Sequence, residues 1–179
     1  MFYLSQYQSP MGLITLASQQ NKLVGVWIEG QKYFGTILKA EKQYHANLPI
    51  FNQTKKWLDD YFEGRKPNIK QLELAPHGTP FQHLVWQILC QIPYGQVITY
   101  GNIAKQIALQ TNKASMSSQA VGGAVGHNPI SIIIPCHRVV GANGNLTGYA
   151  GGIDKKIKLL EIEGLDMTQF FNPNKGTAL

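Results

Sequence analysis

The sequence Ile-Ile-Ile-Pro-Cys-His-Arg-Val, residues 132–139, is the stretch around which the rest of the chain can be organised. Its apolar run Ile132–Ile134 predicts a buried strand or extended segment. Pro135 fixes its own φ and lacks a backbone N–H, so regular strand pairing should end there. Cys136 is therefore expected at the end of a rigid support.

The thiol of Cys136 can be structural or reactive. A structural cysteine needs only an apolar niche, whereas a reactive one needs positive charge, hydrogen-bond donors or a proton acceptor nearby to form a thiolate. His137 and Arg138 follow directly and can supply these. Because a cysteine beside a histidine is more often a packed small residue, the remaining sequence has to decide.

Further motifs surround this stretch in a fixed order. Upstream lie Ile98-Thr99-Tyr100, Ala120–Ala124 (Ala-Val-Gly-Gly-Ala) and Asn128-Pro129, and downstream lie 148–152 (Gly-Tyr-Ala-Gly-Gly) and 159–164 (Leu-Leu-Glu-Ile-Glu-Gly). From about Thr79 to about Gly164, their order and spacing resemble the O6-alkylguanine-DNA alkyltransferases. This family moves alkyl groups from damaged DNA onto its own cysteine.

The charge distribution fits a polyanionic partner. The net charge is +6, and no Asp or Glu occurs between Ala75 and Ile153. DNA binding depends on a phosphate attraction that carboxylates would oppose. The alternative is that this polar segment is only a solvated surface.

The two cysteines, Cys90 and Cys136, are expected to be free thiols. The N-terminus lacks the basic and apolar regions of a signal peptide, and this favours a reducing compartment, the cytoplasm or, in a eukaryote, the nucleus. No apolar run reaches the ~20 residues of a membrane helix, and no spacing suggests a zinc site. We therefore expect no membrane partner and no metal.

The first part of the chain reads as an α/β module. Strands are predicted at 13–17 and 23–28, with a turn at 19–22 between them, a helix at 51–62, and a short strand around 72–74. Its aromatic residues are expected in the core.

The second part reads as mainly helical. Thr79 should cap a helix that begins at Pro80, and Thr99 should cap another over 100–108. A helix of small residues over 115–125 would complete a helix-turn-helix, and a last helix, capped by Asp154, should run to about Glu163. Residues after Asp166 look poorly ordered.

These patterns predict an α/β domain followed by a mainly helical domain. The boundaries are 1–76 for a supporting N-terminal domain, 77–166 for a DNA-binding and catalytic domain, and 167–179 for a tail. The family resemblance further implies a ribonuclease-H-like fold for the first domain and a winged helix-turn-helix for the second.

The resemblance also implies catalytic roles. Cys136 would be the nucleophile, and His137 would accept its proton through a bound water. Glu163 would orient His137, Tyr100 would donate a proton to the departing base, and Asn128 would support the site. Nucleophile, base and orienting group follow the logic of a hydrolase triad. No metal or organic cofactor is needed.

The same resemblance implies contacts with the flipped base. The backbone carbonyl of Val139 would accept its amino group, and Tyr149 would reach its O6 atom. Ala150 and Gly151 would line the base site; some family members carry serine where this chain has Ala150, so one contact to the base is expected to be missing.

The DNA-binding residues implied by the resemblance are Gln119, Ala120, Gly122, Arg138 and Tyr100. The family usually inserts an arginine into the gap left by the flipped base, and this chain has Gln119 there. Glutamine lacks the charge and planar fork of arginine. Weaker flipping is therefore expected.

We therefore predict a single-turnover DNA-repair enzyme of the methylated-DNA–protein-cysteine methyltransferase type. It would act on O6-alkylguanine, and less efficiently on O4-alkylthymine, in double-stranded DNA, and be a monomer in free solution. The alternative is a lesion-binding relative with weak or no transfer because of Gln119. A helix-turn-helix regulator would not need Pro135–Arg138, and no second signature supports a cysteine hydrolase.

Overall fold

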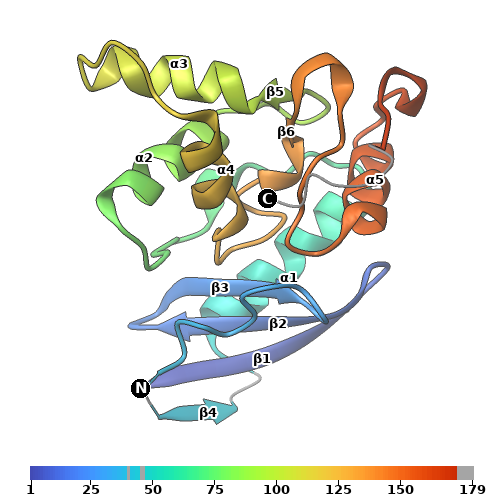
Figure 1. Cartoon of the computed structure of the whole chain (residues 1–179). Helices are drawn as coiled ribbons and strands as arrows, with labels where there is room; N and C mark the ends of the chain where they lie inside the picture. Colours follow the sequence, from blue (N-terminus) through green and yellow to red (C-terminus); the bar gives the residue numbers. More distant parts are fainter. Residues whose placement is uncertain (40, 45–46, 173–179) are drawn as a thin grey trace. The chain divides into compact units, whose positions relative to one another are not determined.

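The computed structural model describes residues 1–39, 41–44 and 47–172 (Figure 1). The chain separates into two compact units. The first comprises Met1–His77 with Pro129–Ile133, and the second comprises Gly78–Asn128 with the chain from Ile134 onward.

A four-stranded sheet in the order β3-β2-β1-β4 forms the base of the first unit. Its strands are β1 (Phe2–Ser9), β2 (Gly12–Gln19), β3 (Lys22–Ile28) and β4 (Lys42–Tyr44). Strands β1, β2 and β3 pair antiparallel, whereas β4 runs parallel to β1. The predicted strands at 13–17 and 23–28 are confirmed as β2 and β3.

The turn between β2 and β3 consists of Gln20 and Asn21, with φ of 50° and 60°. A two-residue hairpin favours positive φ at both central residues because that twist matches the strands. Strands β1 and β4 were not predicted. The burial of β1 does not alternate regularly, and β4 is fully exposed, so neither carries a clear period-two pattern.

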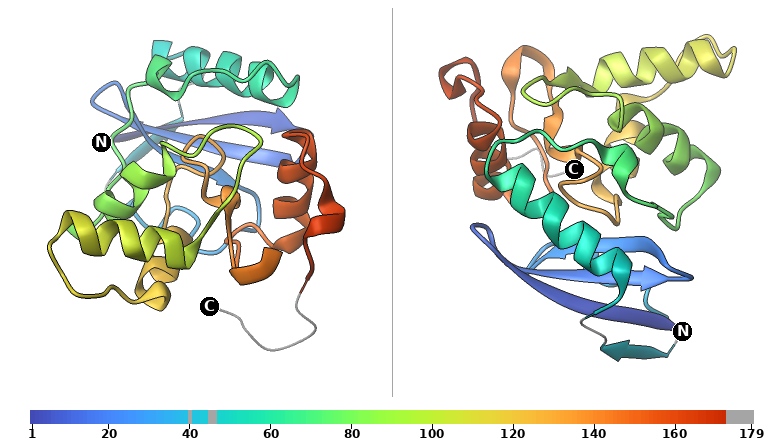
Figure 2. Two further views of the ribbon diagram at one scale, coloured as in Figure 1. Left: turned by 90° about the horizontal axis from the view of Figure 1, so that it is seen from above. Right: turned by 180° about the vertical axis from the view of Figure 1, so that it is seen from behind.

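Helix α1 (Pro49–Phe62) packs on β2 and β3, and crosses the sheet in Figure 2. It begins two residues before the predicted start because Pro49 occupies its first turn, a favoured position. Its buried residues are Ile50, Phe51, Thr54, Trp57, Leu58 and Tyr61. The strand expected around 72–74 is reduced to a single bridge between Leu74 and Leu23.

The second unit begins with helix α2 (Pro80–Leu89), whose predicted cap is confirmed. The Thr79 hydroxyl accepts from the Gln82 amide at 3.2 Å, and the Thr79 amide donates to the Gln82 side chain at 2.8 Å. This reciprocal pairing satisfies two amides that the helix itself leaves unbonded.

Helices α3 (Tyr100–Gln110) and α4 (Ser118–Gly126) pack together as the predicted helix-turn-helix. Thr99 caps α3 as expected. Helix α4 begins three residues later than predicted because the Ser117 hydroxyl, not an earlier residue, accepts from the Ala120 amide.

Short elements carry the chain to the last helix. They are β5 (Ile98–Thr99), the 3₁₀ turn η2 (Cys136–Arg138), β6 (Val139–Val140), the 3₁₀ turn η3 (Ala142–Gly144) and α5 (Ile153–Ile162). Strands β5 and β6 pair in parallel. The predicted Asp154 cap of α5 is wrong, because the helix already starts at Ile153 and Gly152 is its N-cap.

The residues before Cys136 are buried as predicted, but they form turns rather than a strand. The Ile133 amide donates to the Ser131 carbonyl at 2.9 Å across Ile132, whose φ is 72°. Positive φ is strained for a β-branched residue. An apolar run reports burial but not backbone conformation, which explains the wrong prediction.

The expectation of poor order after Asp166 is also wrong for the described residues. A 3₁₀ turn, η4, spans Met167–Gln169, and Phe171 forms a bridge with Asn145. Met167 and Phe170 pack against the buried cluster of Val140, Leu146 and Leu160. Residues 173–179 lie outside the described chain.

Candidate active site

Cys136 opens the 3₁₀ turn η2 and is only 4% exposed. Pro135 has φ −82° and ψ 64°, and the Cys136 amide donates to the Ile134 carbonyl at 2.8 Å. These values define an inverse γ-turn, which suits the fixed φ of proline. The turn delivers the thiol into the interior of the second unit.

Several groups act on the Cys136 thiol. Burial raises its pKa, and the Asn128 side chain, the Lys156 charge and the amides of Cys136 and His137 oppose that rise. The Asn128 amide group also donates to the Ile134 carbonyl at 2.8 Å, which fixes its orientation. The supporting role of Asn128 stays a prediction.

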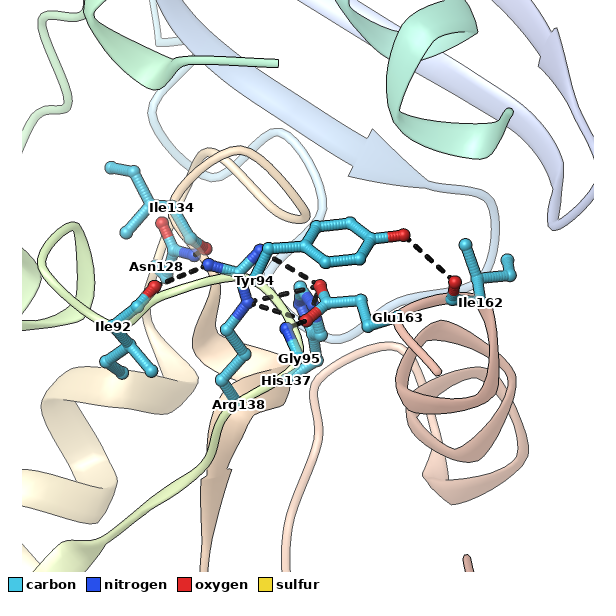
Figure 3. A network of polar contacts seen from close by, with 9 residues as sticks. All are labelled: Ile92, Tyr94, Gly95, Asn128, Ile134, His137, Arg138, Ile162 and Glu163. Carbon is cyan, nitrogen blue, oxygen red and sulfur yellow. Dashed lines mark hydrogen bonds and ion pairs between the residues drawn. The ribbon is translucent and has the colours of Figure 1, made fainter. Parts of the chain in front are cut away.

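Glu163, the C-cap of α5, is the centre of a buried polar network (Figure 3). Its Oε1 lies 2.6 Å from His137 Nε2, and its Oε2 accepts from the Gly95 amide at 2.9 Å. Arg138 Nε donates to Oε2 at 2.9 Å, and Arg138 Nη2 donates to Oε1 at 3.0 Å. Both carboxylate oxygens are therefore bound by charged or polar donors.

This network sets the protonation of its members. Burial alone would raise the pKa of Glu163, but His137 and Arg138 lower it to about 2. Burial lowers the pKa of His137, and Glu163 only partly opposes this. We therefore expect an ionised Glu163 and a neutral His137 whose Nε2–H donates to the carboxylate. Nδ1 is then the ring nitrogen that can accept a proton.

Arg138 does not fit the predicted DNA-binding role. It is 9% exposed, and its Nη1 donates to the Ile92 carbonyl at 2.6 Å while its other donors hold Glu163. The guanidinium also lies 5.7 Å from the ring centroid of Tyr94, whose hydroxyl donates to the Ile162 carbonyl. Its partners are thus groups of the protein interior, and this contradicts the contact with DNA.

The charge of an ionised Cys136 acts on two tyrosines, Tyr100 and Tyr149. Burial and that charge raise the pKa of Tyr100 to about 12, and raise that of Tyr149 well above its ordinary value. The Tyr100 hydroxyl donates to the Thr147 and Gly148 carbonyls at 3.3 and 3.4 Å. The Tyr149 hydroxyl is buried, and no other group in the described part of the chain hydrogen-bonds it.

The segment expected to bind the base is held by a buried lysine. Lys156 Nζ donates to the Val139 carbonyl at 2.5 Å and to the Thr147 carbonyl at 3.0 Å. A carbonyl has two lone pairs, so the Val139 carbonyl can still accept a second donor. Gly151 is needed because a Cβ there would lie 2.7 Å from the Tyr149 ring. Ala150 is half-buried beside it.

Helix α4 presents a face of small and polar residues. Gln119 and Ala120 are exposed, as a DNA contact requires, but Gly122 is buried, and this contradicts its predicted contact with DNA. Gly123 is exposed instead, and a Cβ on it would meet nothing within 4 Å. The Trp86 indole donates to the Ala124 carbonyl at 2.9 Å, a buried hydrogen bond that holds α4 against α2.

Sequence reasoning missed two residues of the site, Gly95 and Lys156. Gly95 supplies an amide to Glu163 from a turn in which its φ is 76°, and only the glycine in Pro93-Tyr94-Gly95 hinted at it. Lys156 had a clearer signal. Its helical spacing from Leu160 and Glu163 places it on the inward face of α5, where a charge is unusual.

The chain belongs to the 6-O-methylguanine DNA methyltransferase family. Residues 2–76 match its ribonuclease-like domain, and residues 80–165 match its DNA binding domain. The chain is thus a member of an alkyl-transferring class, as the motifs around Cys136 predict, and the two-domain fold is confirmed.

Relatives cover nearly the whole chain. A methylated-DNA–protein-cysteine methyltransferase of Methanosarcina acetivorans is 42% identical over 90% of this chain and 98% of its own, and one of Haemophilus influenzae is 39% identical over 90% and 86%. The crystal structure of Mycobacterium tuberculosis OGT in complex with DNA aligns with a TM-score of 0.78 at 38% identity, covering 94% of each chain.

Among the residues that the structure describes, no helix is long and apolar enough to span a membrane. Within the same residues, no three His, Cys, Asp or Glu side chains gather in a way that could hold a metal ion.

Proposed function

We propose that this chain repairs O6-alkylguanine in double-stranded DNA, and O4-alkylthymine less efficiently, by moving the alkyl group onto its own Cys136. The observation that carries the proposal is the placement of Cys136 beside a neutral His137 that is held by an ionised Glu163. Family membership supports the same reaction, and the names of the relatives do not favour a lesion-binding protein without transfer.

The reaction needs no external oxidant or reductant. The Cys136 sulfur attacks the alkyl carbon, a carbon–sulfur bond forms, and the bond between that carbon and O6 breaks. The thiol proton passes towards Nδ1 of His137, and the departing guanine takes a proton from Tyr100. The products are guanine and a thioether. Because a thioether is very stable, each molecule acts once.

Tyr100 suits the donor role because its pKa of about 12 keeps it protonated at neutral pH. It is 7% exposed, so its contact with DNA would be limited to a base that enters the site. The buried Tyr149 hydroxyl can donate to the O6 atom, and this would remove the cost of ~1–3 kcal/mol for leaving it unbonded. Val139, Ala150 and Gly151 would frame the same base.

Helix α4 would enter the duplex with Gln119 and Ala120, and Gly123 would allow close approach of the DNA backbone. Residues 1–76 would support the repair domain, residues 77–166. We further propose that the protein acts in the compartment that holds the DNA, the cytoplasm or a nucleus, as a monomer when free in solution.

The test is one incubation with a duplex that carries a single O6-methylguanine, followed by peptide mass spectrometry. One methyl group per chain on the Cys136 peptide is expected. Cys136→Ser should abolish transfer and keep DNA binding, whereas Cys90→Ser should transfer normally. Methylation of Cys90, or repeated turnover, would contradict the mechanism.

A further inference from the structure

Lys156 is a buried charge that the proposed reaction does not use. It is 0% exposed, and it is the one buried lysine among the residues that the structure describes. An ammonium group in the interior loses its hydration and needs compensating partners. Packing alone would not favour a lysine over an apolar side chain in this position.

The partners of Lys156 are parts of the active site. One is the Val139 carbonyl at 2.5 Å, and Val139 itself donates its amide to the Cys136 carbonyl at the end of η2. The other is the Thr147 carbonyl at 3.0 Å, which also accepts from Tyr100. A single ammonium thus ties the turn that carries the nucleophile to the segment that leads into Tyr149.

The titratable groups that interact with the Lys156 charge are Cys136 and His137 on η2. Tyr100 and Tyr149 respond to the Cys136 charge instead. The Lys156 charge lowers the pKa of Cys136 and also that of His137. It therefore favours a thiolate and keeps the imidazole neutral. The charge would disfavour a protonated His137, but the Glu163 carboxylate opposes that effect.

We propose, on the basis of the function proposed above, that charged Lys156 is a positioning residue for alkyl transfer. It acts through Cys136, whose thiolate it stabilises. It also acts through the Val139 and Thr147 carbonyls, whose separation it fixes.

The Lys156 charge should also determine how the rate of transfer depends on pH. Burial lowers the pKa of Lys156 to about 8, so its charge is lost as the pH rises through that value. Ionisation of a thiol by itself makes a transfer rate rise with pH. A Lys156-dependent rate instead passes through a maximum and falls on the alkaline side.

The experiment uses the full chain with Cys90→Ser, so that Cys136 is its one thiol. Lys156→Met removes the charge at similar length, Lys156→Arg keeps a permanent charge, and Lys158→Met on the exposed side of α5 is the matched control. The pKa of Cys136 is measured from the ultraviolet absorbance of its thiolate, with folding checked by circular dichroism. Transfer from the methylated duplex is followed in single turnovers across the same pH range.

Lys156→Met should raise the pKa of Cys136 by about one unit or more, because the Lys156 charge favours the thiolate and a nearby opposite charge typically shifts a pKa by ~1–3 units. Transfer at neutral pH should slow at least about tenfold, in line with that shift. Lys156→Arg should lose the alkaline fall in rate, and Lys158→Met should match the parent chain.

An unchanged thiol pKa in folded Lys156→Met would overturn the proposal. If that variant fails to fold, a parent chain whose rate shows no alkaline fall would overturn it equally. Failure of the proposed function looks different, since the parent chain would then transfer no methyl group although its thiol pKa still responded to Lys156.

Discussion

The chain holds two cysteines in one compact unit, and their surroundings differ in kind. Cys90 follows the last residue of helix α2, where burial raises its pKa to about 11 and only the charge of Arg138 opposes this. Cys136 is more deeply buried, but the Asn128 side chain, the Lys156 charge and two backbone amides act on it.

The comparison shows that burial does not make a thiol reactive. Both thiols are pushed towards the neutral form, so neither is a stable thiolate at neutral pH. Cys136 differs because donors can stabilise the thiolate when it forms and His137 can take the proton. The reactive cysteine is defined by the path of its proton rather than by a low resting pKa.

Among the variants that test this difference between Cys90 and Cys136, Glu163→Gln is expected to have the largest effect. The change keeps the size of the side chain but removes the charge that holds His137 as a proton acceptor. General base catalysis contributes roughly 10²–10⁴-fold, so single-turnover transfer should slow about a hundredfold while DNA binding is kept. The exposed Glu161→Gln on the same helix is the control.

If Glu163→Gln transfers at the parental rate between pH 6 and 8, Glu163 is only a helix-end acid.

The effect of Glu163 on stability can be measured separately from its effect on transfer. The pKa of Glu163 in the folded chain is about 2, below its ordinary 4.5. Its stabilisation is therefore complete above about pH 4.5 and is lost as the pH falls towards 2, a dependence that Glu163→Gln should remove.

The second expected effect concerns Arg138, whose charge acts on Cys90 and whose side chain binds Glu163 of the Cys136 site. Arg138→Met leaves Glu163 without its bidentate partner and the Ile92 carbonyl without a donor. Breaking a buried ion pair in this way costs roughly 3–5 kcal/mol of the free energy of unfolding, measured by urea titration. The pKa of Cys90 should rise further, because Arg138 is the charge that lowers it.

Arg65 provides the matched control for Arg138. It pairs with Asp60 at 2.6 Å and also with Glu63, but all three side chains are accessible to solvent. Exposed ion pairs contribute little to stability, so Arg65→Met should leave the urea midpoint nearly unchanged. Equal losses for both variants would mean that burial of the Arg138 pair is unimportant.

A smaller effect tests whether burial suppresses the ionisation of Cys90. With a pKa of about 11, only ~10⁻⁴ of the Cys90 thiol is ionised at pH 7. In a Cys136→Ser chain, the rate of alkylation by iodoacetamide should therefore rise about tenfold for each pH unit up to roughly pH 11. A plateau already near the ordinary value of 9 would show that burial does not protect this thiol.

The smallest expected effect concerns how the base reaches Cys136, a step that has no counterpart at Cys90. Gln119→Ala should slow repair of a duplex by a few-fold relative to repair of the free base, because only the duplex requires base flipping, which costs a few kcal/mol. Gln119→Arg should be neutral or faster, since arginine adds a phosphate contact and a hydrogen-bonding fork.

The quantity to compare is the ratio of duplex rate to free-base rate in each variant. Gln53→Ala, the same change at an exposed position of α1, is the control. One common ratio in all of these chains would show that Gln119 does not fill the gap.

The sequence by itself determined the elements whose signals are local. The Thr79 and Thr99 caps are confirmed because a cap involves residues only three positions apart. Strands β2 and β3 and the two helices of the helix-turn-helix are confirmed because apolar or small residues extend along whole elements. The motif order likewise placed the chain in its family, since each motif is a contiguous stretch.

The family motifs already paired Glu163 with His137, but only the tertiary structure decided its other partners, Gly95 and Arg138. Gly95 and Arg138 come from segments distant from Glu163 in the sequence, so no local pattern could show that Arg138 binds a carboxylate of the interior rather than DNA. The buried direction of Lys156 has the same origin. A charged side chain is normally solvated, and its burial depends on carbonyls that other segments bring to it.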